Sequence, residues 1–341
     1  MPCRAPAPFG QGPVFPHIQP EKEERKVFHM SKQPIPVLLD GDPGHDDAMA
    51  WMLAAASPAL KILSVTSCSG NQTIEKTTYN ALRVMALLGI NAPMAMGGTP
   101  MLGKEMPVPA VHGASGLDGA DLPEPKQAPV DLPAVELMAQ VIRSSPDPVT
   151  IVPTGPLTNV AALFAAHPEL KSRVERISLM GGGIAHGNWT PAAEFNILVD
   201  PEAADMVYRS GVPIVMAGLD VTEKAMLMPS DFDRIRAVGG KVSTVIADLL
   251  EFFFQFHKSL GYPGCTIHDA VAVAYLYAPE LFTGTDMYVA VETGGRYTRG
   301  ATIGDVHNLW GKAPNVHVLT GVDREGFADL FVEAVSHWKE D

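Results

Sequence analysis

Several kinds of residue are scarce in this 341-residue sequence, and each scarcity excludes something. Only three cysteines occur, Cys3, Cys68 and Cys265, and their wide spacing fits neither a disulfide framework nor a zinc motif. Basic residues number 25 against 38 acidic ones, which gives a formal net charge of −13. A nucleic acid or an anionic membrane is therefore not expected as a partner, because both are bound through basic surfaces.

Long apolar runs are also missing. No stretch of about 18 uninterrupted apolar residues is present, so we predict no transmembrane helix. The first 33 residues are rich in proline, contain the charged run EKEERK and lack the apolar core of a secretory signal. We predict a disordered extension over residues 1–33, a single domain over residues 34–341 and a cytoplasmic location, since few cysteines favour a reducing compartment.

From residue 34 onward, short apolar runs alternate with helical patterns. Strands are expected at 36–40, 61–70, 149–153, 176–183 and 212–220, and helices lie between them, as at 46–56 and 73–89. This alternation predicts an α/β fold with a largely parallel central sheet and helices on both faces. In such sheets ligands bind at the carboxyl ends of the strands.

The segment LLDGDPGHDDAMA crowds aspartates around one such end. Within residues 38–50 lie Asp40, Asp42, Asp46 and Asp47. No basic residue stands among them, and ionising several neighbouring carboxylates is costly. The last two fall at the start of the next helix, where the helix dipole relieves part of the repulsion. A hard divalent cation, Ca²⁺ or Mg²⁺, would relieve the rest. The simpler alternative is that Asp46 caps the helix and the others are solvated.

Further polar residues recur after other predicted strands. A turn in VPTGPLTN can aim a backbone carbonyl at a cation, and amide and carboxylate side chains in GNWTPAAEFNILVDPEAA suit sugar hydroxyls. Turn chemistry, a helix cap and an ordinary loop histidine are the alternative interpretations. The candidates are Asn71, His112, Thr154, Asn188, Glu194, Asn196, His268 and Asp269.

Together these segments resemble the inosine–uridine-type nucleoside hydrolases. The resemblance runs from about residue 36 to the C-terminus and rests on DGDPGHDDA, GNQT, VHGASGLDG, PTGPLTN, GNWTPAAEFNILVDPEAA and a late HD pair, in that order. GNWTPAAEFN and AGLDVT are most similar to the bacterial pyrimidine-specific ribonucleoside hydrolases. The resemblance implies Ca²⁺-dependent hydrolysis of ribonucleosides, with uridine and cytidine preferred, in nucleoside salvage or catabolism. It also implies a homo-oligomer, a tetramer or a dimer.

The resemblance assigns roles to the residues at the metal end. The metal ligands would be the Asp42, Asp47 and Asp269 carboxylates and the backbone carbonyl of Thr154. Asp42 would also accept a proton from the attacking water, which Asn71 helps to orient.

It assigns the substrate contacts in the same way. His268 would protonate the departing base, because the unperturbed pKa of histidine lies near neutrality. His112 lies in a glycine-rich loop that is a candidate lid over the substrate. The sugar hydroxyls would be held by Asp46, Asn188, Glu194 and Asn196.

The sequence departs from the family pattern at the base-contacting helix. Some members carry a tyrosine eight positions before the HD histidine, where this chain has Leu260. The same helix instead offers His257, which either contacts the base, assists its departure, or is a surface histidine. Base preference is therefore open, and a broad or inosine-cleaving hydrolase is the alternative within the family.

Two other classes of protein are weighed against this one. A calcium-dependent nucleoside-binding protein without catalysis would use the same residues. A haloacid-dehalogenase-type phosphatase is disfavoured, because Gly44 stands where a threonine or valine is common and no later lysine motif is found.

Overall fold

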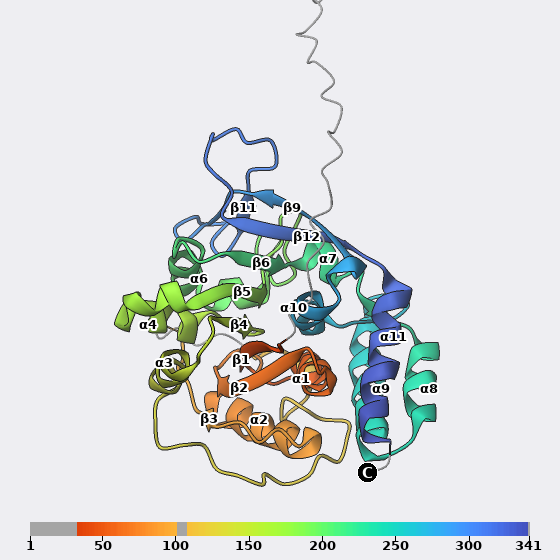
Figure 1. The fold of residues 1–341 in the computed structure, drawn as a ribbon. Coiled ribbons are helices and arrows are strands. Elements are labelled where there is room, and N and C mark those ends of the chain that lie inside the picture. The colour runs from red at the N-terminus through yellow and green to blue at the C-terminus, as the bar shows by residue number, and fades with distance from the viewer. Residues whose placement is uncertain (1–32, 101–107, 340–341) are drawn as a thin grey trace, which may run out of the picture. The chain divides into compact units, whose positions relative to one another are not determined.

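An eight-stranded sheet forms the centre of the computed structural model, which describes residues 33–100 and 108–339 (Figure 1). Its strands lie in the order β3-β2-β1-β4-β5-β6-β12-β9, and every neighbouring pair is parallel except β12 and β9. The predicted α/β fold with a largely parallel sheet is confirmed. Its strands are β1 Ile35–Gly41, β2 Leu60–Ser67, β3 Met94–Ala95, β4 Val149–Pro153, β5 Val174–Met180, β6 Ile214–Ala217, β9 Phe282–Met287 and β12 Val316–Val322.

Two antiparallel strand pairs stand apart from this sheet. Strands β7 Met226–Leu227 and β8 Cys265–Thr266 form one pair, and β10 Val289–Val291 and β11 Thr302–Gly304 form the other. The predicted extension over residues 1–33 lies, except for Gln33, outside the described residues. In the ranges that are described, no helix combines the length and the apolar character needed to cross a bilayer.

Helices cover both faces of the sheet (Figure 1). One apolar core packs α1, α9, α10 and α11 against it, and a second packs α3, α4 and α6 on the opposite face. The helices are α1 His45–Ala56, α2 Ile74–Leu88, α3 Ala134–Ser144, α4 Thr158–Ala166, α5 Phe195–Val199, α6 Pro201–Tyr208, α7 Leu219–Thr222, α8 Pro229–Val238, α9 Lys241–Ser259, α10 His268–Tyr277 and α11 Arg324–Val335. Short 3-10 turns span Ala110–His112, Pro168–Arg173, Pro279–Leu281 and Ser336–Trp338.

Local sequence explains where these elements begin and end. Strand β1 reads as a continuous apolar run because a strand between two layers of helices is buried on both faces. Val37, Leu38 and Leu39 are accordingly buried. Helix α2 ends at Gly89, whose φ of 69° is the left-handed conformation that stops a helix and that glycine adopts without strain.

The strand order reverses beside β1. Following the chain, the sheet grows from β1 towards β2 and β3, and then on the other side through β4, β5 and β6. A crevice opens at such a point because the connections on its two sides leave in opposite directions. Asp42 follows β1 and Thr154 follows β4, so both stand at this crevice.

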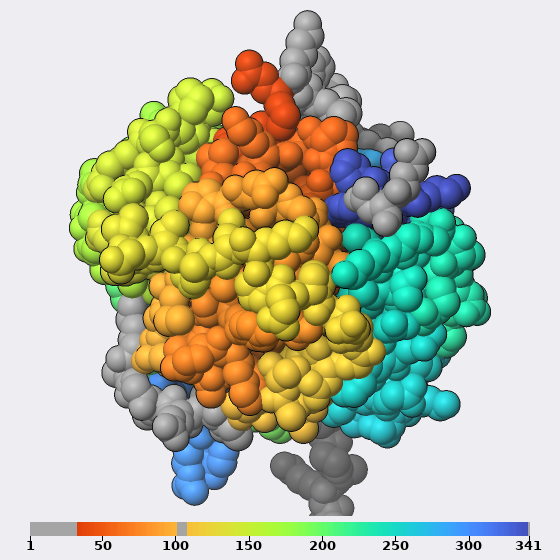
Figure 2. Space-filling view, turned by 90° about the horizontal axis from the view of Figure 1, so that it is seen from below, coloured from red at the N-terminus to blue at the C-terminus, as the bar shows by residue number. Residues whose placement is uncertain are grey.

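A long connection after β3 crosses the same end of the sheet. Figure 2 shows its described part, in yellow, over α2, in orange, and beside α8 and α9, in teal. The Arg83 side chain of α2 donates to the carbonyl of Leu122 at 2.7 Å, and the backbone of Gly119 lies against Phe252 of α9. The connection thereby carries His112 to the crevice.

Candidate active site

A cavity of 360 Å³ lies at the carboxyl end of the sheet. Its walls come from the segments after β1, β2, β4 and β5, from α9 and from the start of α10. Of the residues that the sequence predicts for the site, all except Asp42 and Asp47 line it, and these two are buried behind the wall. The lining residues among them are Asp46, Asn71, His112, Thr154, Asn188, Glu194, Asn196, His257, His268 and Asp269.

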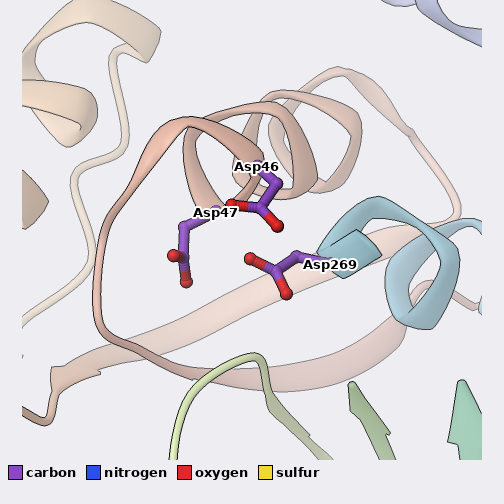
Figure 3. Close-up of side chains that lie close together, drawn as sticks. All are labelled: Asp46, Asp47 and Asp269. Atoms are coloured by element: carbon purple, nitrogen blue, oxygen red, sulfur yellow. The ribbon is translucent and has the colours of Figure 1, made fainter. Parts of the chain in front are cut away.

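Three carboxylates converge (Figure 3), and since two of them, Asp46 and Asp269, line the cavity, we call this cluster its floor. Asp46 and Asp47 come from the first turn of α1 and Asp269 from the first turn of α10. One oxygen of each lies within 4.8 Å of the others. This cluster contains Asp46, for which a sugar contact is predicted, and it does not contain Asp42. The sequence predicts a crowded acidic site here, and the structure places three buried carboxylates in it.

Asp42 stands beside the cluster with one oxygen held. Its Oδ2 accepts the backbone N–H of Asn71 at 2.7 Å, while Oδ1 is buried and has no hydrogen-bond partner among the described residues. Burial raises the pKa of the Asp42 carboxyl well above its usual range, and the nearby charge of Asp47 raises it further. Burial likewise raises the pKa of Asp46 to about 8.

The fourth aspartate of the motif has another environment. Oδ1 of Asp40 accepts the hydroxyl of Thr66 at 2.6 Å and the side-chain amide of Asn159 at 2.8 Å. Asp40 lies within β1, one residue before that strand ends, and it does not line the cavity. Asp40 therefore links β1 to β2 and α4. Of the four aspartates crowded in the sequence, Asp40 has a structural role, and the other three lie at the site.

The polar residues after β5 form a hydrogen-bonded corner. Glu194 accepts the backbone N–H of Asn196 at 2.9 Å and that of Gly182 at 2.8 Å, so it caps α5 while it lines the cavity. Oδ1 of Asn188 accepts the N–H of Phe195 at 3.0 Å, which leaves its amide hydrogens for a ligand. The side chain of Asn196 donates to the carbonyl of Thr154 at 2.9 Å, and that carbonyl keeps a second lone pair.

Three histidines, His112, His257 and His268, line the wall of the cavity. His257 is only 5% exposed and lines the cavity, so the surface interpretation of this residue is wrong. Burial lowers the pKa of His268 to about 3. An imidazole that loses its hydration resists taking up a charge, so this environment favours the neutral ring of His268. A role for His268 as a neutral hydrogen-bond donor is compatible with this environment.

His112 is held by a histidine inside the aspartate motif. His45 Nε2 lies 2.8 Å from the carbonyl of Asp118, and His45 Nδ1 lies 3.1 Å from His112 Nδ1. Since a carbonyl only accepts, the proton of neutral His45 sits on Nε2. The backbone N–H of His45 also donates to His112 Nδ1 at 3.3 Å. The backbone and the ring of His45 thus both contact His112 Nδ1 and hold the ring in the cavity wall.

Comparison with known proteins identifies the family. A family model described as inosine-uridine preferring nucleoside hydrolase matches residues 37–329. The chain belongs to this family of nucleoside hydrolases. It is 52% identical over 308 residues to the pyrimidine-specific ribonucleoside hydrolase RihA of Salmonella newport (strain SL254), covering 89% of this chain and 99% of that protein. The RihA protein of Escherichia coli (strain K12) matches at the same identity and coverage.

Solved structures agree with this assignment. A purine-preferring ribonucleoside hydrolase from Gardnerella vaginalis superposes with a TM-score of 0.83 at 32% identity, covering 89% of this chain and 99% of that one. The resemblance drawn from the motifs is confirmed. This nucleoside hydrolase is therefore an enzyme that acts on N-glycosyl compounds, and its family depends on a metal.

The acidic floor of this nucleoside hydrolase fits a metal ion. Its donors are hard carboxylate oxygens, and three of them lie within reach of one cation. Oδ1 of Asp42 and Oδ1 of Asp46 are buried without a hydrogen-bond partner in the described parts of the chain. Buried carboxylates with unused oxygens are costly unless a positive charge is bound among them.

Sequence reasoning missed several residues of the wall. Trp189 and Phe195 meet at 5.0 Å between ring centroids, Phe253 stacks on His45 at 5.1 Å, and Thr266 lies between two histidines. A usable signal existed only in α9, where Phe253 and His257 are four residues apart and share a face. Glu223 also lines the cavity and pairs with His186 at 3.1 Å, which no motif indicates.

Proposed function

We propose that this nucleoside hydrolase cleaves the N-glycosidic bond of uridine and cytidine with Ca²⁺ as its metal. The observation that carries the proposal is a single cavity with a carboxylate cluster at its floor and three histidines, His112, His257 and His268, on its wall. The preference for pyrimidines is supported by relatives at 52% identity that are named pyrimidine-specific.

The metal would be held by four groups. Asp47 and Asp269 belong both to the predicted ligand set and to the carboxylate cluster. Asp42 and the second lone pair of the Thr154 carbonyl complete the set that we propose. When bound, Ca²⁺ supplies positive charge that lowers the pKa of a water and polarises it for attack. Asp46, which we assign to a ribose hydroxyl, has an oxygen within 4.8 Å of those of Asp47 and Asp269, so the sugar would lie next to the metal.

Asp42 is the proposed general base. Its Oδ2 is occupied by the Asn71 N–H, so the remaining lone pairs on Oδ1 are the ones left to accept a proton from the attacking water. The Asn71 side chain lies 3.3 Å from the carbonyl of Asp42 and lines the cavity, where it would orient that water.

The ribose would lie against Asp46, Asn188, Glu194 and Asn196. Cleavage of an N-glycosidic bond passes through an oxocarbenium-like state in which the sugar becomes positive, as in glycoside hydrolysis. Carboxylates below the ring favour that charge. The fixed hydrogen bonds of Glu194 keep its carboxylate in place, so it pays little reorganisation as the charge develops.

The departing base would meet the histidines. His112 lines the cavity, and since His45 contacts its Nδ1, its Nε2 is the ring nitrogen that would face the base. His268 offers an N–H rather than an imidazolium, since burial keeps its ring neutral. A base that leaves with a hydrogen bond instead of a full proton transfer suits pyrimidines, whose carbonyl oxygens accept such bonds.

Release of free ribose tests the proposal. Uridine, cytidine and inosine are assayed in parallel, with and without a strong chelator, followed by addition of Ca²⁺ or Mg²⁺. We expect ribose from both pyrimidine nucleosides, loss of activity after chelation and recovery with Ca²⁺. Inosine cleaved as fast as uridine would replace the pyrimidine preference with a broad one. Calcium-dependent binding of uridine without ribose release would replace the enzyme with a binding protein.

Assembly and location complete the proposal. We propose a homo-oligomer, a tetramer or a dimer, on the strength of the family resemblance, and light scattering of the purified protein tests it. We propose a cytoplasmic location because Cys68 and Cys265 are buried free thiols, which a reducing compartment preserves.

A further inference from the structure

A chain of side-chain hydrogen bonds runs along the histidine wall of the cavity. Thr222 Oγ1 lies 2.8 Å from His268 Nδ1, and His268 Nε2 lies 3.0 Å from Thr266 Oγ1. Thr266 Oγ1 lies 2.5 Å from His257 Nε2, and His257 Nδ1 lies 3.1 Å from the carbonyl of Phe253. The chain links α9, β8 and the start of α10, which follow one another in the sequence, to Thr222 of α7, which lies 46 residues before His268.

The last contact sets the direction of every bond in the chain. The Phe253 carbonyl can only accept, so neutral His257 carries its proton on Nδ1 and its Nε2 accepts. Burial lowers the pKa of His257, which keeps the ring neutral. Cys265 Sγ, at 3.7 Å from the same Nδ1, is a weaker partner and can accept as well as donate.

The remaining protons follow in order. Because His257 Nε2 accepts, the hydroxyl of Thr266 donates its single hydrogen there. Thr266 can then only accept from His268, which must carry a proton on Nε2. The Nδ1 of neutral His268 is left to accept the hydroxyl of Thr222. One backbone carbonyl in α9 thus determines the tautomer of a histidine in α10, and Thr266 transmits it.

We propose that Thr266 is a positioning residue that fixes the proton of His268 on Nε2 and holds His257 and His268 as one hydrogen-bonded unit. The inference rests on the proposed function, because it concerns the wall that would face the departing base. Thr266 is 2% exposed and lies at the cavity wall between the two rings. The donor that His268 presents to a base is then its Nε2–H, shared with Thr266.

Replacing the hydroxyl while keeping the shape tests this role. Thr266→Val removes the hydroxyl, and Thr266→Ser removes only the methyl group. We expect kcat for uridine to fall by about tenfold to a hundredfold in Thr266→Val, with KM changed less, and to recover to near the wild-type value in Thr266→Ser. A loss of equal size in both variants would mean that Thr266 contributes packing, and would overturn the proposal.

The tautomers of His257 and His268 can be measured directly, and a change in packing alone would not alter them. Ring nitrogens of ¹⁵N-histidine-labelled protein report which nitrogen carries the proton, and His257→Phe and His268→Phe assign the two signals. We expect Nδ1–H for His257 and Nε2–H for His268, and a mixture of tautomers at His268 in Thr266→Val. Nδ1–H at His268 in the wild-type protein, or an unchanged tautomer in Thr266→Val, would overturn the proposal.

A matched control distinguishes the effect of losing the Thr266 hydroxyl from the general effect of losing any buried hydroxyl. Ser243 is buried in α9, and its hydroxyl donates to the carbonyl of Ile235 at 2.5 Å, away from the cavity. Ser243→Ala should lower the thermal midpoint without changing kcat or the tautomers. If the wild-type protein released no ribose from any nucleoside, the proposed function would fail, yet the tautomer measurement would still decide the role of Thr266.

Discussion

Asp42 is the residue whose surroundings most strongly suggest a proton acceptor. One of its oxygens is held by a backbone N–H and the other is buried without a partner in the described chain. We predict that Asp42→Asn lowers kcat for uridine by about a hundredfold or more, because an amide cannot take up the proton of the attacking water. Steady-state kinetics at saturating Ca²⁺ measures this effect.

Although kcat should fall, we expect Asp42→Asn to leave the folded protein at least as stable as the wild type when no metal is bound. The amide oxygen can still accept the Asn71 N–H, and one charge leaves a crowded acidic group, so the metal-free protein should not lose thermal stability. Asp121→Asn, at an exposed position outside the cavity, is the control and should change neither quantity. An Asp42→Asn enzyme as fast as the wild type would remove Asp42 from the mechanism.

For single residues, the sequence indicated which residue types belong to the site, but it did not indicate their hydrogen-bond partners. It placed Asp40 and Asp42 in one crowded group because they are two positions apart. The structure separates them, since Thr66 of β2 and Asn159 of α4 donate to Oδ1 of Asp40, which lies outside the cavity lining. The sequence also does not show that burial lowers the pKa of His268, because burial depends on residues that the local motif does not contain. Partners distant in the chain decide both outcomes.

The 3-10 turn Ala110–His112 is the element that depends most on a single partner. His45 contacts the carbonyl of Asp118 and the ring of His112, and it stacks on Phe252 and Phe253. Two hydrogen bonds of this kind contribute about 1–3 kcal/mol together. We predict that His45→Phe keeps the stacking, releases residues 110–118 and raises KM for uridine.

Hydrogen exchange measures that release directly. Backbone amides in 110–118 should exchange faster in His45→Phe, while those of α6, on the opposite face of the sheet, should not change. Unchanged exchange in 110–118 would show that the contacts of Asp118 with Ser115 and Ala114 hold the turn by themselves.

Helices and strands could be predicted where a long hydrophobic pattern marks them. Short strands that form only by pairing with a distant part of the chain could not. Helix α2 shows both its apolar stripe and its glycine stop in the sequence, and its predicted range 73–89 differs from the observed Ile74–Leu88 by one residue at each end. Strands β7 and β8 are two residues each and exist because Met226 pairs with Thr266, which is forty positions away. No local pattern indicates such a pair, and Thr266 therefore escaped notice although it lies between two predicted site residues.

The metal links the floor of the cavity to the stability of the whole molecule. Asp46 and Asp47 begin α1 and Asp269 begins α10, and these two helices pack together in one core of the sheet. Without a cation their carboxylates repel across that contact. A ligand that binds the folded state alone stabilises it by about 2.7 kcal/mol at a hundred times its Kd. Binding at the site should therefore be visible in unfolding.

We predict that Ca²⁺ raises the thermal midpoint of the chelator-treated protein by roughly 5–10 °C at such a concentration. Asp269→Asn should remove most of this shift, because Asp269 joins α10 to the cluster, whereas Asp121→Asn should preserve it. Differential scanning fluorimetry over a series of Ca²⁺ and Mg²⁺ concentrations measures both. The thermal midpoint could stay unchanged on addition of Ca²⁺ although ribose release requires Ca²⁺. This result would mean that the ion binds only together with the nucleoside, through the sugar hydroxyls. A shift that survives in Asp269→Asn would place the ion elsewhere in the molecule.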